Sequence, residues 1–330
     1  MTTRPRLTPA IADIRRAVRA SMVELVETGP GKPLVLVALS GGPDSLALAA
    51  ASAFEAAGHA GAVIIDHGLQ EGSAEVANRA AEQARALGLD PVIVRQVEVG
   101  NAGGPEAAAR DARYAALADV AYETGAVAVL LGHTLDDQAE TVLLGLARGS
   151  GATSLQGMGP VGGIYRRPLL GIRRSTTVQA CADATLEPWA DPQNEDPAFT
   201  RVRVRRTVLP LLETELGPGV AEALARTAEQ LREDAAALDH FAEEIVEELA
   251  DIAEAGISLP VNALASNPPA LRQRLIRLAV QGEFHVSLSR AHTLEVARLV
   301  TDWHGQKALD LPGLRVERQG GLIIFSAREA

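Results

Sequence analysis

The chain has 330 residues, of which 47% are hydrophobic, and a formal net charge of -11. This length suits two domains, and the apolar content is sufficient for a sizeable core. The acidic balance excludes a protein that binds nucleic acid through its overall charge, so a polyanionic partner would need a local basic patch. The single cysteine, Cys181, excludes an intrachain disulfide and a cysteine-based zinc or iron–sulfur centre.

Location and the type of positive charge also follow from composition. The N-terminal region lacks the apolar segment of a signal peptide, and the sequence contains no apolar run of about 18 residues. We therefore expect a cytoplasmic protein with no membrane partner. Lys32 and Lys307 are the only lysines, so nearly all positive charge is arginine, which suits bidentate contacts to phosphate.

In chain order, the first predicted elements lead to a glycine turn. Apolar residues at helical spacing predict a helix over 8–28, an apolar strand follows at 34–39, and a second helix covers 46–57. The turn between strand and helix consists of Ser40, Gly41, Gly42, Pro43, Asp44 and Ser45. This arrangement directs backbone N–H groups and the positive end of the helix dipole towards an anion.

The turn differs from two common phosphate-binding loops. No lysine follows the glycines, which excludes a Walker loop, and the third glycine of the dinucleotide fingerprint is absent. The hydroxyls of Ser40 and Ser45 add donors for a phosphate. A carboxylate cannot bind phosphate directly, so Asp44 indicates a magnesium ion between the two groups.

Polar residues follow two later strands of the predicted sheet. The strand at 62–65 ends in Asp66 and His67, and the strand at 126–131 is followed by His133 and a group of carboxylates. This group consists of Asp136, Asp137 and Glu140. Ligands of open parallel sheets bind beyond the carboxyl ends of strands, so we expect a site there. An acidic helix N-terminus needs only one aspartate, and a magnesium ion shared by Asp44 and Asp136 accounts for the excess.

Alternating strands and helices predict the fold class. Four strand–helix units, with a third strand at 91–99 and a helix at 106–124, predict an α/β fold with a doubly wound parallel sheet. Residues 152–163 are expected to form a loop, and a helix follows at about 174–185. We place the domain boundary after residue 217, giving domains 1–217 and 218–330. The smaller domain is expected to be mainly helical, with helices at 220–255, 269–281 and 287–301 and a hairpin near 314–326.

Two groups of arginines are candidates for phosphate contacts. Arg113 lies in the helix at 106–124 and could hold a nucleotide or RNA phosphate, whereas Arg110 on the same helix is better explained as a solvated charge. The densest basic tract consists of Arg201, Arg203, Arg205 and Arg206. Such a tract in an acidic chain is typical of RNA contacts, although a solvated helix face would give the same pattern.

Several motifs resemble one family of the PP-loop ATP pyrophosphatases, the tRNA(Ile)-lysidine synthetases. The segments are SGGPDS at 40–45, IDHGL at 65–69, GHTLDDQAET at 132–141, RGSG at 148–151, RPLL at 167–170, and Asp191, Pro192, Asn194, Thr200, Arg201, Arg203, Arg205 and Pro210. The resemblance covers about residues 34–215. Thr134 replaces a frequent histidine and Val202 a frequent asparagine, which leaves the roles of these two side chains open.

The resemblance implies an ATP-dependent ligase. In this family, ATP adenylates the wobble cytidine of a tRNA(Ile) with a CAU anticodon, and free lysine then displaces AMP to form lysidine. It further implies a nucleotide site at residues 40–45, Asp66 and His67, a magnesium ion on Asp44 and Asp136, and a lysine site at Asp137 and Glu140. His133 and Arg113 are expected near the reaction, and Arg148 and the arginine tract against tRNA. A homodimer is left open.

Two alternatives from other classes compete with this interpretation. A PP-loop enzyme that thiolates tRNA normally uses catalytic cysteines or a cluster, and one cysteine argues against it. A non-catalytic regulator that binds adenine nucleotides would need neither the two aspartate clusters nor the arginine tract.

Overall fold

Two compact units make up the computed structural model, Met1–Leu231 and Arg232–Ala330. The structure describes residues 7–26, 33–68, 72–100, 104–149, 151–249, 251–253 and 256–327. Leu69 and Ser150 of the sequence motifs, and residues 27–28 of the first predicted helix, lie outside the described residues. The division into units falls inside α10 (Val220–Leu249), whereas the expected domain boundary precedes this helix.

A six-stranded sheet organises the first unit and confirms the predicted doubly wound fold. Its strand order is β3-β2-β1-β4-β6-β5, and the pairs among the first five strands in this order are parallel. The strands are β1 Val35–Ala38, β2 Ala60–Asp66, β3 Val92–Gln96, β4 Ala128–Leu130, β5 Val161–Gly162 and β6 Tyr165–Arg166. The expected loop at 152–163 was wrong in part, because helix α6 (Ala152–Leu155) and strand β5 occupy it.

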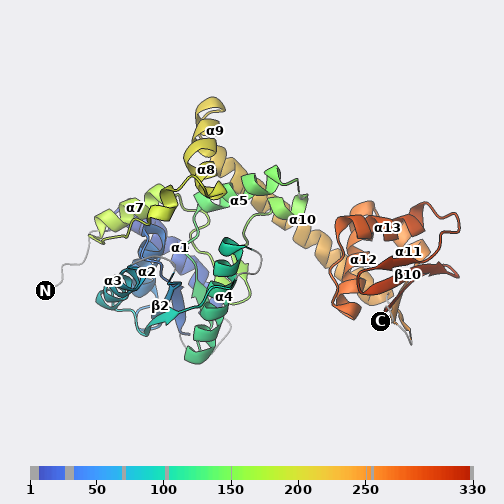
Figure 1. The fold of residues 1–330 in the computed structure, drawn as a ribbon, viewed down its shortest axis with the longest axis horizontal. Helices are drawn as coiled ribbons and strands as arrows, with labels where there is room; N and C mark the ends of the chain where they lie inside the picture. The colour runs from blue at the N-terminus through green and yellow to red at the C-terminus, as the bar shows by residue number, and fades with distance from the viewer. Residues whose placement is uncertain are drawn as a thin grey trace. The chain divides into compact units, whose positions relative to one another are not determined.

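Helices cover both faces of this sheet. One face packs against α2 (Pro43–Glu55) and α3 (Ser73–Ala86), with α1 (Pro9–Val26) and α7 (Arg174–Asp183) packed against α2, and the other face packs against α4 (Pro105–Thr124). In Figure 1, α2 and α3 lie on one side of β2 and α4 on the other. The buried strands read as continuous apolar runs because both of their faces are covered. The carboxyl ends of β1, β2, β4 and β6 therefore meet along one edge.

A further helical run carries the arginine tract. It consists of α8 (Thr200–Arg203), the π-helical segment η2 (Val204–Val208) and α9 (Leu209–Glu215), and η2 packs against α5 (Leu135–Ala147). Pro210 has no N–H and cannot donate the regular bond to the carbonyl four residues earlier, which favours a local change of helix type. The short helix η1 (Pro192–Glu195) precedes this run.

The second unit combines helices with an antiparallel sheet. Its helices are the rest of α10, α11 Val261–Ser266, α12 Pro269–Phe284 and α13 Arg290–Thr301. Its strands are β7 Asp251–Ala253, β8 Gly256–Pro260, β9 Leu309–Leu311, β10 Leu314–Gln319 and β11 Leu322–Ala327, in the order β7-β8-β11-β10-β9. The expected hairpin is confirmed by β10 and β11. The predicted helix at 220–255 was too long, because Ile252 pairs with Ile257 in a hairpin instead.

Within the residues that the structure describes, every helix is too short or too polar to cross a bilayer.

The close approach of Gly132 to the glycine turn can be tested by adding one methyl group. A Cβ at Gly132 would lie 3.0 Å from the Ser45 backbone N and 3.1 Å from the Asp44 carbonyl carbon. Both neighbours are backbone atoms, so we expect Gly132→Ala to cost about 1–3 kcal/mol of stability and to weaken ATP binding. Thermal denaturation and ATP titration measure the two effects. Gly171→Ala, where a Cβ meets open space, is the control; equal melting temperatures for both variants would contradict the expectation.

Candidate active site

The glycine turn is held in shape by its own serines. The Ser45 hydroxyl accepts from the Ser40 backbone N at 3.1 Å and donates to the Gly42 carbonyl at 3.0 Å. Gly41 has a φ of 83°, which favours glycine at this position. Helix α2 starts with Pro43, and no side chain caps its first turn. The free N–H groups of that turn can therefore bind an anion.

The carboxyl end of β2 contributes Asp66 and His67. Asp66 is buried, and its Oδ1 accepts from the Gly68 backbone N at 3.0 Å, which fixes the chain reversal after the strand. The Nδ1 atom of His67 is buried and has no hydrogen-bond partner. Burial, together with the charge of Arg113, lowers the pKa of His67. This imidazole is therefore favoured in its neutral form.

Thr134 and Asp137 form a capping box at the start of the helix that follows β4. Thr134 is the N-cap of α5, and its backbone N and hydroxyl donate to Asp137 Oδ2 at 2.8 and 2.7 Å. The expected single capping carboxylate is thus Asp137, and Thr134 acts as its partner. Asp136 and Glu140 remain for other contacts.

One residue, Arg174 at the start of α7, contacts four carboxylates. Its backbone N donates to Asp136 Oδ2 at 2.7 Å, and its Nε donates to Asp44 Oδ2 at 3.1 Å. Its terminal nitrogens donate to Asp137 Oδ1 at 2.7 Å and to Glu140 Oε1 at 3.5 Å. The glycine turn and the acidic start of α5 therefore lie side by side.

Glu140 is fully buried and is surrounded by arginines. Arg205 Nε and NH2 donate to its two carboxylate oxygens at 2.6 and 3.0 Å, and Arg201 Nε lies 3.7 Å from Oε2. Arg205 also donates to Asp137 Oδ1 at 3.3 Å. Arg173 contacts Asp136 at 3.3 Å. The carboxylates are thus neutralised by arginines from α7 and from the run at 200–208.

Protonation states follow from this arrangement. Burial, assisted by neighbouring Asp137, raises the pKa of Asp44, although Arg174 and Thr177 oppose the shift. Burial would also raise the pKa of Asp137, but Arg174 and the Thr134 hydrogen bonds outweigh it and hold this pKa below its usual value. Burial and nearby arginines lower the pKa of His133 to about 4, so His133 is neutral at pH 7.

Cys181 packs against the glycine turn, and its thiol has low reactivity. Its Sγ contacts the Pro43 carbonyl oxygen at 3.4 Å, and the side chain is buried. Burial, with the charge of Asp44, raises the pKa of the thiol to about 12. The thiolate needed for sulfur chemistry is therefore scarce at neutral pH.

The sequence candidates fall into three groups in space. Asp44, Asp136, Asp137, Glu140, Arg201 and Arg205 form one acidic–arginine cluster. His67, His133 and Arg113 interact on the α4 side of the edge. Arg148, Arg203 and Arg206 are exposed. Sequence reasoning missed Arg173, Arg174 and Thr177; the adjacent arginines ahead of a predicted helix were the available signal.

The oxygen donors suit magnesium, although their partners in this structure are arginines. Among the described residues, no group of three or more His, Cys, Asp or Glu side chains could hold a metal. Asp44 and Asp136 both contact Arg174, so a two-carboxylate site is the arrangement available. Magnesium is commonly bound through one or two carboxylates together with substrate phosphates, so this donor pair fits.

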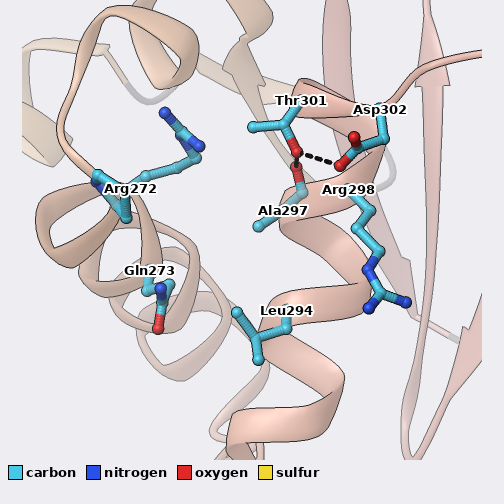
Figure 2. Close-up of a pocket in the computed structure, with 8 residues that line it drawn as sticks. Arg272, Gln273, Leu294, Ala297, Arg298, Thr301 and Asp302 are labelled. Carbon is cyan, nitrogen blue, oxygen red and sulfur yellow. Dashed lines mark hydrogen bonds between the residues drawn. The ribbon is translucent and has the colours of Figure 1, made fainter.

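The second unit has a pocket between α12 and α13 with a volume of about 240 Å³ (Figure 2). Its lining consists of Pro269, Arg272, Gln273, Leu294, Ala297, Arg298, Thr301 and Asp302. Arg272 donates to the carbonyl oxygens of Leu264 and Asn267 at 2.8 and 2.9 Å. Thr301 donates to Asp302 at 2.7 Å. The pocket carries both charge signs and contains none of the sequence candidates.

Comparison with solved structures supports the fold. The U34-tRNA thiolase NcsA from Methanococcus maripaludis, solved with its [4Fe-4S] cluster, superposes with a TM-score of 0.57 at 19% identity. The match covers 68% of this chain and 80% of that one. At this identity the likeness concerns the fold alone.

Comparison of sequences gives matches of much higher identity. The PP-loop domain model matches residues 14–212, and the TilS substrate binding domain model matches residues 259–321. The tRNA(Ile)-lysidine synthase of Leifsonia xyli is 64% identical over 308 residues, covering 90% of this chain and 93% of that one. That of Thermobifida fusca is 52% identical, covering 97% and 98%. These matches agree with the turn at 40–45 and the acidic cluster beside it, and the chain belongs to the tRNA(Ile)-lysidine synthase family.

Proposed function

We propose that this protein uses ATP to join free lysine to the wobble cytidine of tRNA(Ile) with a CAU anticodon, releasing AMP and pyrophosphate. The observation that carries the proposal is Arg174, which ties the glycine turn to the buried carboxylates of α5. A site for a triphosphate thus adjoins a site for a cation. The names of the relatives supply the identity of the RNA and of the product. The cytoplasm, which supplies ATP, lysine and tRNA, is the compartment we propose.

In the first step, the glycine turn holds the pyrophosphate part of ATP. The uncapped N–H groups of α2 and the left-handed Gly41 suit close approach of phosphate oxygens. Asp44 and Asp136 would hold magnesium, which would supply positive charge to the triphosphate during attack by the cytidine carbonyl oxygen. Arg174 already bonds to both carboxylates and keeps them oriented.

In the second step, the acidic cluster receives lysine. The ammonium group of lysine carries the same charge as the guanidinium groups of Arg174 and Arg205, which now contact Asp137. Lysine binding therefore requires one of these arginines to give up a carboxylate contact. His133, Asp137 and Glu140 are the candidates for taking the proton that the attacking amine loses. Of these, His133 is neutral and interacts with Asp137, but its pKa of about 4 makes it a weak base.

Incubating the protein with ATP, labelled lysine and tRNA(Ile) tests the function directly. We expect label in the RNA, together with AMP and pyrophosphate rather than ADP and phosphate. Removing an electrostatic stabiliser typically costs about 100- to 1,000-fold in rate, so Asp44→Ala and Asp136→Ala should each slow turnover by that factor. Asp119→Ala, at an exposed position of α4, is the control.

The cysteine separates this function from thiolation. Because its thiol is buried and protonated, Cys181→Ala should retain lysine incorporation. Loss of all activity in a folded Cys181→Ala protein, or a product containing sulfur, would contradict the ligase.

Asp137→Asn tests the lysine site. The amide oxygen can still accept from Thr134 at the cap of α5, but the negative charge is lost. We expect a raised KM for lysine and a reduced kcat, with the KM for ATP nearly unchanged. Steady-state kinetics with each substrate varied in turn measure these constants. An unchanged lysine KM would remove Asp137 from the lysine site.

The arginine tract divides into two functional halves. Arg203 and Arg206 are exposed, whereas Arg201 and Arg205 point to Glu140. We expect Arg203→Ala with Arg206→Ala to weaken tRNA binding and to reduce its salt dependence by roughly one unit of slope per lost phosphate contact. Binding in a salt series measures this, with Arg95→Ala as the control. An unchanged slope would show that these two arginines form only a solvated face.

A further inference from the structure

Three arginines gather around one tyrosine at the edge of the sheet, on the α4 side. Arg110, Arg113 and Tyr114 lie in the first half of α4, and Arg167 directly follows β6. Since β6 is parallel to β4, Arg167 lies at the same edge as His133, which follows β4. The charges of all three arginines act on His133. This group is distinct from the acidic cluster around Arg174.

Tyr114 interacts with all three arginines. Arg110 NH2 donates to the Tyr114 phenolic oxygen at 3.3 Å, and the charges of Arg110, Arg167 and Arg113 all act on this phenol. The guanidinium carbons of Arg110 and Arg113 lie 4.9 and 5.7 Å from the centre of the tyrosine ring. The ring packs edge-on against Tyr165 at 4.8 Å, and Tyr165 donates to the Tyr114 carbonyl oxygen at 2.8 Å. These two contacts with Tyr165 hold the Tyr114 ring in place.

The described residues provide no carboxylate partner for the positive charge of this group. Over the part of the chain that the structure describes, none of the three arginines has an ion pair with a carboxylate. The Nε atoms of Arg113 and Arg167 are buried without a hydrogen-bond partner, as are the Nδ1 atoms of His67 and His133. Arg110 is exposed, and Arg167 NH1 donates to the Gly159 carbonyl oxygen at 2.9 Å. The buried, unpartnered donors of Arg113 and Arg167 are costly unless a ligand compensates them. Burial and the proximity of Arg110 also lower the pKa of Arg113.

We propose that Arg110, Arg113 and Arg167, grouped around Tyr114, form a second phosphate-binding site beside the glycine turn. Several guanidinium groups around one position suit the oxygens of a phosphate, which they bind by charge-assisted hydrogen bonds. The site takes either the α-phosphate of the nucleotide or a phosphodiester of the RNA. The inference rests on the proposed function and deepens it. Arg113 was expected to contact a phosphate, whereas Arg110 was expected to be solvated and Arg167 had no assigned role.

Binding experiments without turnover test this site and separate its two sources of phosphate. The variants are Arg110→Gln and Arg167→Gln, and Arg95→Gln is the matched control because Arg95 pairs with Glu123 at the other end of α4. Charge-assisted hydrogen bonds are worth about tenfold or more in affinity. A tenfold loss of AMP affinity, with adenosine binding unchanged, identifies the α-phosphate. A tenfold loss of tRNA affinity with a reduced salt slope identifies the phosphodiester.

The following results would contradict the proposed phosphate-binding site. Affinities for AMP and tRNA within about twofold of the unmodified protein, in variants with unchanged melting temperature, would make the cluster structural. A weakened affinity for lysine alone, measured by direct binding, would assign the arginines to a carboxylate instead. If the arginine variants fail to fold, Tyr114→Phe keeps the ring contact with Tyr165 and removes the phenolic acceptor of Arg110. Unchanged phosphate binding in that variant also refutes the site. Because no product is measured, failure of lysine transfer leaves this test intact.

Discussion

The contacts of Arg174 with four carboxylates hold the site together. They join the turn before α2, the start of α5 and the start of α7, which lie far apart in sequence. A carboxylate as buried as Glu140 would be strongly destabilising without such partners, because the desolvation of an unpaired charge is not recovered. The charge of the acidic residues therefore requires the arginines, and the arginines fix the geometry.

The edge of the sheet carries two charge clusters of opposite character. Around Arg174, carboxylates and guanidinium groups compensate one another, so a cationic substrate has to exchange with an arginine. Around Tyr114, none of the guanidinium groups forms an ion pair with a carboxylate among the described residues, which is the basis of the proposed phosphate site. The glycine turn ends β1, which is the neighbour of both β2 and β4. A nucleotide on that turn therefore lies at the edge where both clusters are found.

Local patterns predicted most of the first unit because its central strands are continuous apolar runs followed by residues typical of turns. Val35 to Ala38 and Ala128 to Leu130 are buried on both faces, and such runs are recognisable without knowledge of their partners. The short strands β5, β6 and β7 lie in no such apolar run. β5, β6 and β7 form because each pairs with a neighbouring strand. The sequence around Ile252 continues the helical pattern of α10, and the pairing of Ile252 with Ile257 interrupts that pattern.

The sequence by itself determined the alternation of strands and helices, the glycine turn and the carboxylates that follow β4, because each depends on neighbouring residues. Only the tertiary structure decided which charges meet. Arg203 and Arg205 are equivalent in the sequence, yet one is exposed and the other binds Glu140, because the π-helical segment faces α5. Arg174 also received its partners from folding, since a pair of residues separated by 37 or 130 positions leaves no periodic trace in the chain.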